Sequence, residues 1–266
     1  PFMLKNRLIT AAVGIPFLIG LAYLGGVYWQ VLIGLLTAAA LIEYCAMMRG
    51  KGFQPFVVSA VFLAFILLFR TQLGSYLAGL FLASLLLMII GLVFTYPQRN
   101  LHDLALSLFG SIYTGFFFSY ALALGRSESA FLILLMVFIL TWASDVGGYL
   151  FGRIWGKHKL APRLSPGKTV EGAAGAIVLT ILAAWGYRYF SGAVYPQVGV
   201  LLVMAFVFSV AAQLGDLLES AIKRFFEVKD SGRILPGHGG VLDRFDSFML
   251  VSPVAYYFLV VLPPFL

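Results

Sequence analysis

The chain has very little charge and almost no cysteine. Only 11% of its 266 residues are charged, whereas a soluble domain carries about 25%. The chain is also 61% hydrophobic, with a mean hydropathy of +0.97. The shortage of charged residues and the high hydropathy exclude a soluble domain and predict an integral membrane protein. The single cysteine, Cys45, excludes an internal disulfide. No soluble nucleic-acid-binding module, low-complexity linker or internal repeat is visible, so no nucleic-acid partner is expected.

Long apolar runs fill most of the sequence. A helix needs about 20 apolar residues to cross a bilayer. We therefore predict an all-α integral membrane protein of about nine transmembrane helices, with cytoplasmic loops that carry the site. The runs do not alternate in polarity, which argues against a β-barrel. The predicted spans are residues 8–26, 28–48, 54–70, 73–95, 103–124, 130–151, 171–190, 197–218 and 245–262.

The basic residues predict the orientation. With a cytoplasmic N-terminus, nine spans place 15 of the 18 Lys and Arg residues on the cytoplasmic side of the membrane. Of the 11 acids, only Glu128 falls on the other side. Acids carry little topological information, so their bias indicates a polar working site on the cytoplasmic face of the inner membrane. By polarity the chain divides into 1–135, with five spans and the start of the sixth, and a C-terminal catalytic region, 136–266.

One cluster of polar residues lies at the C-terminal end of the eighth predicted span. Asp216, Glu219 and Lys223 are spaced i, i+3 and i+7, so they share one helix face. We interpret Asp216 as a carboxylate that faces an interior cavity, with Lys223 and Arg224 just beyond it. The alternative is a solvated helix end.

A Gly-rich turn precedes the ninth span, in LPGHGGVLDRFDS at 235–247. Gly237, Gly239 and Gly240 let backbone N–H groups approach a ligand, and such a turn before a helix is a ready anion site. His238, flanked by these glycines, suggests a phosphate or pyrophosphate contact.

Two carboxylates follow that turn. Asp243 and Asp246 project from one side of the first helical turn, where their repulsion would be relieved by a divalent cation. Mg²⁺ favours a few carboxylates completed by water and substrate phosphates. The alternative is an acidic turn that complements the helix dipole, which leaves the glycines and Arg244 unexplained.

The sixth span ends with an acid at membrane depth. Asp145 lies seven residues before Gly152, about 10 Å of helix, and an ionisable group there is a functional candidate. The alternative is an acid paired with a neighbouring helix. Gly148, Gly152 and Gly156 recur every four residues, which favours close helix packing.

The loop before the seventh span contains SPGKT. Ser165 followed by Pro166 resembles an N-cap with proline at the first helical position. Lys168 would then lie in the first helical turn, either contacting phosphate or anchoring the span. A P-loop is excluded, because Pro162 occupies the position of its first glycine. Glu43, near the end of the second span, is expected to make a structural hydrogen bond.

The segment SAIKRFFEVKDSGRILPGHGGVLDRFD, residues 220–246, resembles the signature of the phosphatidate cytidylyltransferase (CDP-diacylglycerol synthase) family. The segment 144–172 is also similar to its bacterial members, with Gly148 where they often have Ala. The resemblance implies that CTP and phosphatidate react to CDP-diacylglycerol and pyrophosphate with Mg²⁺, as one or two ions. It also suggests membrane lipids as partners and, by analogy with other such enzymes, a homodimer.

The resemblance and the residue patterns together assign roles. The metal ligands would be Asp216, Asp243 and Asp246; the catalytic residues Lys223, Arg224, Lys229, Asp230, His238 and Arg244; and the substrate-binding residues Asp145, Ser165, Lys168, Gly237, Gly239 and Gly240.

Two other functions compete with this hypothesis. A CTP-dependent lipid kinase of the dolichol-kinase type would transfer the γ-phosphoryl group and release CDP. An ion-coupled transporter using Asp145 and Asp216 would need acids on both sides of the midplane, and the one-sided distribution of acids argues against it.

Overall fold

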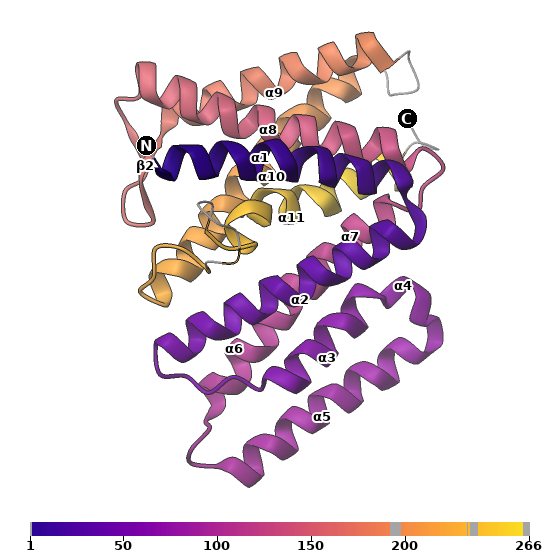
Figure 1. Ribbon diagram of the computed structural model, residues 1–266, viewed down its shortest axis with the longest axis vertical. Coiled ribbons are helices and arrows are strands. Elements are labelled where there is room, and N and C mark those ends of the chain that lie inside the picture. Colours follow the sequence, from indigo (N-terminus) through magenta and orange to yellow (C-terminus); the bar gives the residue numbers. More distant parts are fainter. Residues whose placement is uncertain (1, 192–197, 233, 235–238, 263–266) are drawn as a thin grey trace. The chain divides into compact units, whose positions relative to one another are not determined.

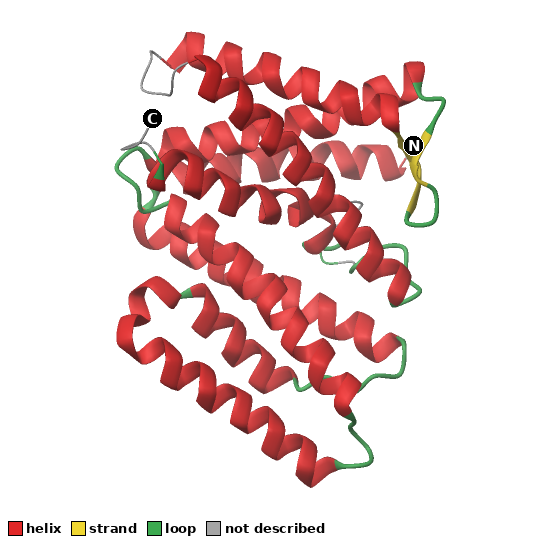
Figure 2. Ribbon diagram, turned by 180° about the vertical axis from the view of Figure 1, so that it is seen from behind, coloured by secondary structure: helices red, strands yellow, loops and turns green. Residues whose placement is uncertain are grey.

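The computed structural model describes residues 2–191, 198–232, 234 and 239–262, with side chains from residue 12 onward (Figure 1). Helices dominate these residues, and the described strands form one short hairpin (Figure 2). The α-helices are α1 (Phe2–Leu24), α2 (Gly26–Gly50), α3 (Val57–Leu68), α4 (Arg70–Leu73), α5 (Leu77–Thr95), α6 (Leu101–Ser111), α7 (Phe117–Leu124), α8 (Ala130–Trp155), α9 (Val170–Ser191), α10 (Val198–Phe225) and α11 (Leu242–Tyr256). The 3₁₀-helix η1 (Gly74–Tyr76), the π-helices η2 (Ile112–Phe116) and η3 (Tyr257–Val261) and the strands β1 (Lys159–Ala161) and β2 (Ser165–Thr169) complete the described elements.

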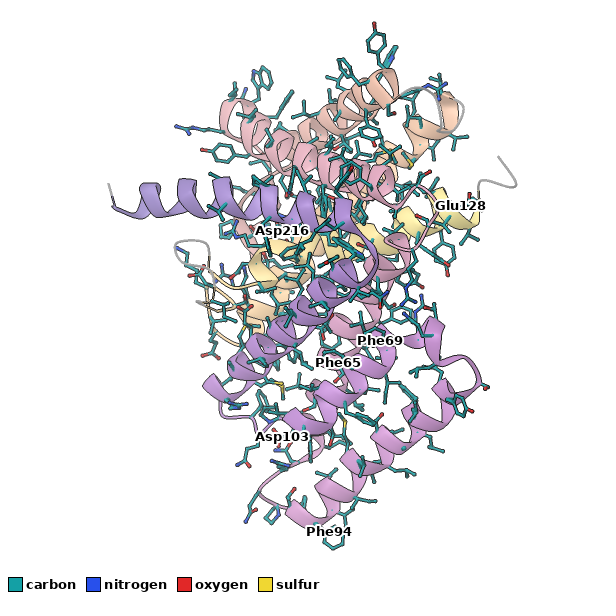
Figure 3. All side chains as sticks on the ribbon, turned by 45° about the vertical axis from the view of Figure 1, so that its right-hand side comes forward. Phe65, Phe69, Phe94, Asp103, Glu128 and Asp216 are labelled. Atoms are coloured by element: carbon teal, nitrogen blue, oxygen red, sulfur yellow. The ribbon has the colours of Figure 1, made fainter. Side chains whose placement is uncertain are left out.

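The helices confirm the predicted all-α membrane class. Within the described residues, seven helical segments are long and apolar enough to cross a membrane, and shorter apolar helices cover the first and third predicted spans. The helix α3 has only 12 residues, about 18 Å, which is less than the hydrocarbon thickness. The number nine is therefore approximate. In α5 only Ser84 and Met88 are buried, and Phe94 projects from its end at 83% exposure (Figure 3), as expected of a lipid-facing helix.

Internal contacts divide the chain into two compact units. The first contains the residues through Ala123 together with Lys223–Arg244, and the second contains Leu124–Ile222 together with the residues from Phe245 onward. The predicted division at residue 135 follows polarity, which is a different property from packing. Each unit contains part of the signature segment, because α10 and α11 both carry residues of each unit.

The first unit packs through aromatic side chains and close backbone contacts. α3 contacts α2, α5, α6 and η2. Trp29 is buried and donates from Nε1 to the Ala121 carbonyl at 2.9 Å. Gly110 faces the Tyr44 ring so closely that an added Cβ would lie 2.5 Å from it. The N-terminal helices thus form a packed body of their own.

The start of α6 follows from two polar residues. The Asn100 side chain accepts from the backbone N–H of His102 and Asp103, and Asp103 accepts in return from the Asn100 N–H at 2.8 Å. This reciprocal arrangement is a capping box. Asp103, labelled in Figure 3, also accepts from the Gln54 N–H at 2.7 Å, although it is almost completely buried.

In the second unit, α8 and α9 run side by side along a seam of glycines (Figure 1). A Cβ on Gly147 would lie 2.7 Å from the Gly175 carbonyl oxygen, and one on Gly172 would lie 2.8 Å from the Gly148 carbonyl oxygen. Gly152 is also close to Gly172. The predicted helix packing is confirmed for Gly148 and Gly152, whereas Gly156 follows the end of α8 and a Cβ there would meet Gly152 and Thr169.

The hairpin corrects the prediction for the loop before α9. Ser165 lies at the start of β2 and pairs with Ala161 of β1, so it is not the N-cap of a helix. Thr169 takes that role, because its Oγ1 accepts from the Gly172 N–H at 3.1 Å as α9 begins at Val170. Lys168 therefore lies in a strand, and its placement in the first helical turn was wrong.

Candidate active site

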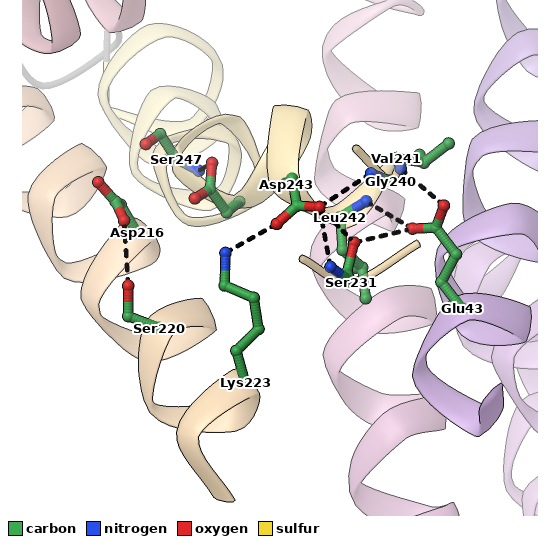
Figure 4. A network of polar contacts seen from close by, with 11 residues as sticks. Glu43, Asp216, Ser220, Lys223, Ser231, Gly240, Val241, Leu242, Asp243 and Ser247 are labelled. Carbon is green, nitrogen blue, oxygen red and sulfur yellow. Dashed lines mark hydrogen bonds and ion pairs between the residues drawn. The ribbon is translucent and has the colours of Figure 1, made fainter. Parts of the chain in front are cut away.

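Polar residues of the signature segment gather around Asp243 in the first unit. Asp243 lies in the first turn of α11, and its side chain is only 7% exposed. Its Oδ1 accepts from Lys223 Nζ at 2.7 Å, and its Oδ2 accepts from the N–H groups of Ser231 and Gly240 at 2.9 and 2.8 Å. The Ser231 hydroxyl lies 3.0 Å from the same oxygen (Figure 4). Asp243 therefore binds both α10 and the loop that leads to α11.

Glu43 holds the same loop from α2. Its Oε1 accepts from the Val241 N–H at 2.9 Å, and its Oε2 accepts from the Leu242 N–H at 3.0 Å. The Ser231 hydroxyl also donates to Oε2, at 3.1 Å (Figure 4). The predicted structural hydrogen bond of Glu43 is confirmed.

The glycines of this loop permit those close contacts. Gly239 has φ +86°, a left-handed conformation that favours glycine. A Cβ on Gly239 would lie 2.7 Å from Asp243 Oδ2, and one on Gly240 would collide with Glu43 and Ser231. The anions at this turn are thus two carboxylates of the protein itself. Gly237 and His238 lie outside the described residues, so their predicted ligand contacts remain predictions.

The second unit contains another lysine–carboxylate pair of predicted site residues. Lys168 Nζ of β2 lies 2.6 Å from Asp216 Oδ2 of α10, and both side chains are partly exposed. Asp216 Oδ1 also lies 3.4 Å from the Ser220 hydroxyl, one helical turn later. The sequence predicted both Lys168 and Asp216 as site residues, and the structure brings them together.

Asp246 lies where α11 meets α10 in this unit. A Cβ on Gly215 would lie 2.5 Å from the Asp246 carbonyl oxygen and 3.0 Å from Ser247 Cα, so the two backbones approach closely. Gly215 immediately precedes Asp216, and the Asp246 side chain accepts from the Ser247 N–H at 2.7 Å. The glycine thus brings the helices that carry Asp216 and Asp246 into contact.

The remaining predicted residues that the structure describes, other than the residues of the hairpin and the loop glycines, are exposed on helices or loops. Arg224 lies in the last turn of α10, Arg244 lies in the first turn of α11, and Lys229 and Asp230 follow α10 in the loop. Asp145 is exposed on α8. These residues keep their predicted roles as hypotheses.

Sequence reasoning missed Ser231. Its position within the signature segment was the available signal, but its link to Glu43 spans 188 positions of the chain. A single sequence does not reveal a contact of that separation.

The donor atoms near Asp216 suit a hard cation. Within the described ranges, no three His, Cys, Asp or Glu side chains converge into a ready metal site. Mg²⁺ does not require one, because it takes one or two carboxylates and completes its shell with water and substrate phosphates. Asp216 and Asp246 are carboxylates of this kind on helices that touch at Gly215, so the residue types fit the predicted Mg²⁺, which would share Asp216 with the Lys168 ammonium.

Comparison with known proteins decides the family. A model of the cytidylyltransferase family matches residues 5–262. The chain belongs to this family. Curated relatives named phosphatidate cytidylyltransferase come from Staphylococcus haemolyticus, Staphylococcus epidermidis and Staphylococcus aureus, at 38%, 40% and 39% identity. Each alignment covers 94% of this chain and 97% of the relative, so the similarity to these family members spans both the N-terminal helices and the signature segment.

Proposed function

We propose that this chain is a CTP:phosphatidate cytidylyltransferase, an enzyme of phospholipid synthesis that makes CDP-diacylglycerol and pyrophosphate. The observation that carries the proposal is the match of nearly the whole chain to relatives of that name. The multi-pass helical fold and the polar residues of the signature segment agree with a lipid substrate and a nucleotide substrate.

The proposed reaction joins two anions. A phosphate oxygen of phosphatidate attacks the α-phosphorus of CTP, the bond from that phosphorus to the α–β bridging oxygen breaks, and pyrophosphate leaves with the bond electrons. The nucleophile is already anionic, so no strong base is needed. The protein must hold both phosphates in line against their mutual repulsion, which is a task of positioning and charge neutralisation.

The chain supplies several cations for that task. Lys168 and Lys223 each have a carboxylate partner that holds the ammonium group in place before substrate arrives. In our proposal these lysines, together with Arg224, Lys229 and Arg244, neutralise the phosphates of CTP and phosphatidate. Their side chains act as fixed positive charges and transfer no proton.

We assign the predicted Mg²⁺ to Asp216 and Asp246 of the second unit. The sequence also predicts Asp243 as a ligand, from its place three residues before Asp246, and that assignment stays a prediction. When bound, the ion would neutralise charge on the triphosphate and the departing pyrophosphate. The contact of α10 with α11 at Gly215 supports the pairing of Asp216 with Asp246.

We infer that the N-terminus and the signature segment face the cytoplasm, from the 15 basic residues predicted on that side. CTP would arrive from the cytosol, and phosphatidate would come from the adjacent leaflet. The homodimer stays a prediction, and all residues assigned here come from one chain.

The test is to incubate the purified protein in detergent with phosphatidate, Mg²⁺ and CTP labelled at either the α- or the γ-phosphorus. We expect the α-label in the lipid phase and the γ-label in pyrophosphate. Chelation of Mg²⁺ should stop turnover, and added Mg²⁺ should restore it. A γ-label in the lipid would instead identify a kinase, and no turnover with either label would contradict an enzymatic function.

A further inference from the structure

Glu43 is a buried carboxylate that lies outside the signature segment. Its side chain is 3% exposed, and it belongs to α2, in the N-terminal part of the chain. A carboxylate so deeply buried is costly unless donors surround it. Here three donors do so, two of them backbone N–H groups and one the Ser231 hydroxyl.

Those donors come from two separate parts of the chain after α10. Ser231 lies six residues after the end of α10 at Phe225, and Val241 and Leu242 lie where α11 starts. A Cβ on Gly232 would lie 2.5 Å from Glu43 Oε1, and a Cβ on Gly240 would also collide with this carboxylate. One side chain from α2 therefore holds two separate parts of the loop, and a glycine in each part makes room for it.

Asp243 holds the same two parts of the loop. It accepts from the N–H groups of Ser231 and Gly240, and the Ser231 hydroxyl lies close to both carboxylates (Figure 4). Asp243 also receives the Lys223 ammonium. The chain of contacts thus runs from Glu43 through Ser231 to Asp243 and Lys223, both of which we place in the reaction.

The electrostatics make this arrangement strong. Hydrogen bonds from backbone N–H groups to an ionised carboxylate are about twice as strong as neutral ones. A carboxylate at a helix N-terminus also opposes the positive end of the helix dipole. Glu43 does both at Val241 and Leu242, where α11 begins, so it holds these residues and the loop before them in place.

We propose that Glu43 is a positioning residue for the cytidylyl transfer. It does not touch substrate; it sets the loop so that Asp243 and Lys223 stand in their working positions. The proposal rests on the proposed function and adds a required residue from the N-terminal helices to it.

The test compares Glu43→Gln with the matched variant Asp103→Asn. Each change is nearly isosteric, and each removes one acceptor oxygen from a buried carboxylate that accepts from two backbone N–H groups of the first unit. Asp103 bonds only to the start of α6 and to Gln54 in the described contacts, and has no assigned role in the reaction. We would measure kcat, the KM for CTP and the thermal midpoint in detergent for both.

We expect Glu43→Gln to lower kcat by about 10–100-fold, the range for residues that orient active groups from outside. Its thermal midpoint should fall no further than that of Asp103→Asn, whose kcat should stay within about twofold of wild type. Equal kinetics for the two variants would overturn the proposal, because a purely structural carboxylate affects stability alone.

Two further variants close the remaining gaps. Ser231→Ala removes the hydroxyl between the two carboxylates, and its effect on kcat should be non-additive with that of Glu43→Gln; additive effects would contradict the chain of contacts. If Glu43→Gln does not fold, Glu43→Asp takes its place. This variant keeps the charge but is one methylene shorter, and it should show the same loss of kcat. If the wild-type protein shows no cytidylyl transfer, the proposed function itself is contradicted.

Discussion

At the scale of single residues, each of two lysines is paired with an acid on a helix. Lys168 lies 2.6 Å from Asp216, and Lys223 lies 2.7 Å from Asp243. Lysine side chains lose considerable rotamer entropy when they are fixed, and the ion pair offsets that loss before substrate binds. A phosphate that arrives then meets a cation already held in place.

Lys168 provides the sharpest test of this arrangement. Lys168→Ala removes the ammonium beside Asp216, so we expect kcat/KM for CTP to fall at least tenfold while the thermal midpoint changes little, because partly exposed ion pairs add at most about 1 kcal/mol. Steady-state kinetics at several CTP concentrations would measure this.

The matched control is Lys159→Ala, on the neighbouring strand, where the side chain is exposed. It removes the same charge from the same hairpin and should leave kcat/KM nearly unchanged. If both variants lose activity equally, the general charge of the hairpin matters and the specific position of Lys168 does not.

The sequence predicted residue types better than residue contacts. Asp216, Asp243 and Lys168 were recognisable because charged residues are rare in this chain and lie in dense segments. The partners of Glu43 were not recognisable, because Ser231, Val241 and Leu242 lie almost 200 positions away along the chain. Only the folded chain brings them together.

At the scale of elements, the hairpin shows where local patterns mislead. Ser165 and Pro166 have the residue types of a helix start, but antiparallel pairing of β2 with Lys159–Ala161 takes those residues into a strand. The helix then begins four residues later, at Val170 and not at Pro166, with Thr169 as its cap. A local cap signal was overridden by a short-range backbone pairing that composition does not reveal.

The seam between α8 and α9 gives a prediction at this scale. Gly147→Ala would place a methyl group 2.7 Å from the Gly175 carbonyl oxygen and 2.9 Å from Ala176 Cα. These are backbone atoms that cannot rotate away, so we expect a loss of about 1–3 kcal/mol of stability. Thermal unfolding in detergent, followed by size-exclusion chromatography, would detect it.

Gly186→Ala, in α9, is the control for that change. A Cβ there meets nothing within 4 Å, and alanine favours a helix over glycine by up to about 1 kcal/mol. This variant should be as stable as wild type or more so. A loss of stability equal to that of Gly147→Ala would show that the helix backbone, and not the seam, responds to the methyl group.

At the scale of the whole molecule, the apolar runs were predictable because each must cover about 30 Å of hydrocarbon. The lengths of the helices were predictable only in part. The predicted span at 54–70, bounded by Pro55 and Arg70, contains a helix of only 12 residues. Just before this helix the Phe56 N–H donates to Ser107 Oγ of α6 at 3.0 Å, a contact with another helix that the sequence does not reveal.

The membrane topology can be tested across α8. The helix has 26 residues, about 39 Å, so Glu128 before it and Lys159 after it should lie on opposite sides of the membrane. We expect an impermeant maleimide to label Glu128→Cys in right-side-out vesicles, and Lys159→Cys only in inverted ones.

The native thiol does not interfere with this measurement, because Cys45 is completely buried. Labelling of both positions from one side would contradict α8 as a span. The reverse pattern would contradict the cytoplasmic placement of the signature segment and leave the span intact.

The length of α10 has a consequence for how two unlike substrates meet. Its 28 residues extend about 42 Å, some 12 Å beyond the hydrocarbon. If its first residues lie at one boundary of the hydrocarbon core, its last two turns lie in the headgroup region at the opposite boundary. The acyl chains of a lipid substrate can then remain in the leaflet while a nucleoside triphosphate binds from the aqueous phase. Neither substrate has to leave its own phase to reach the other.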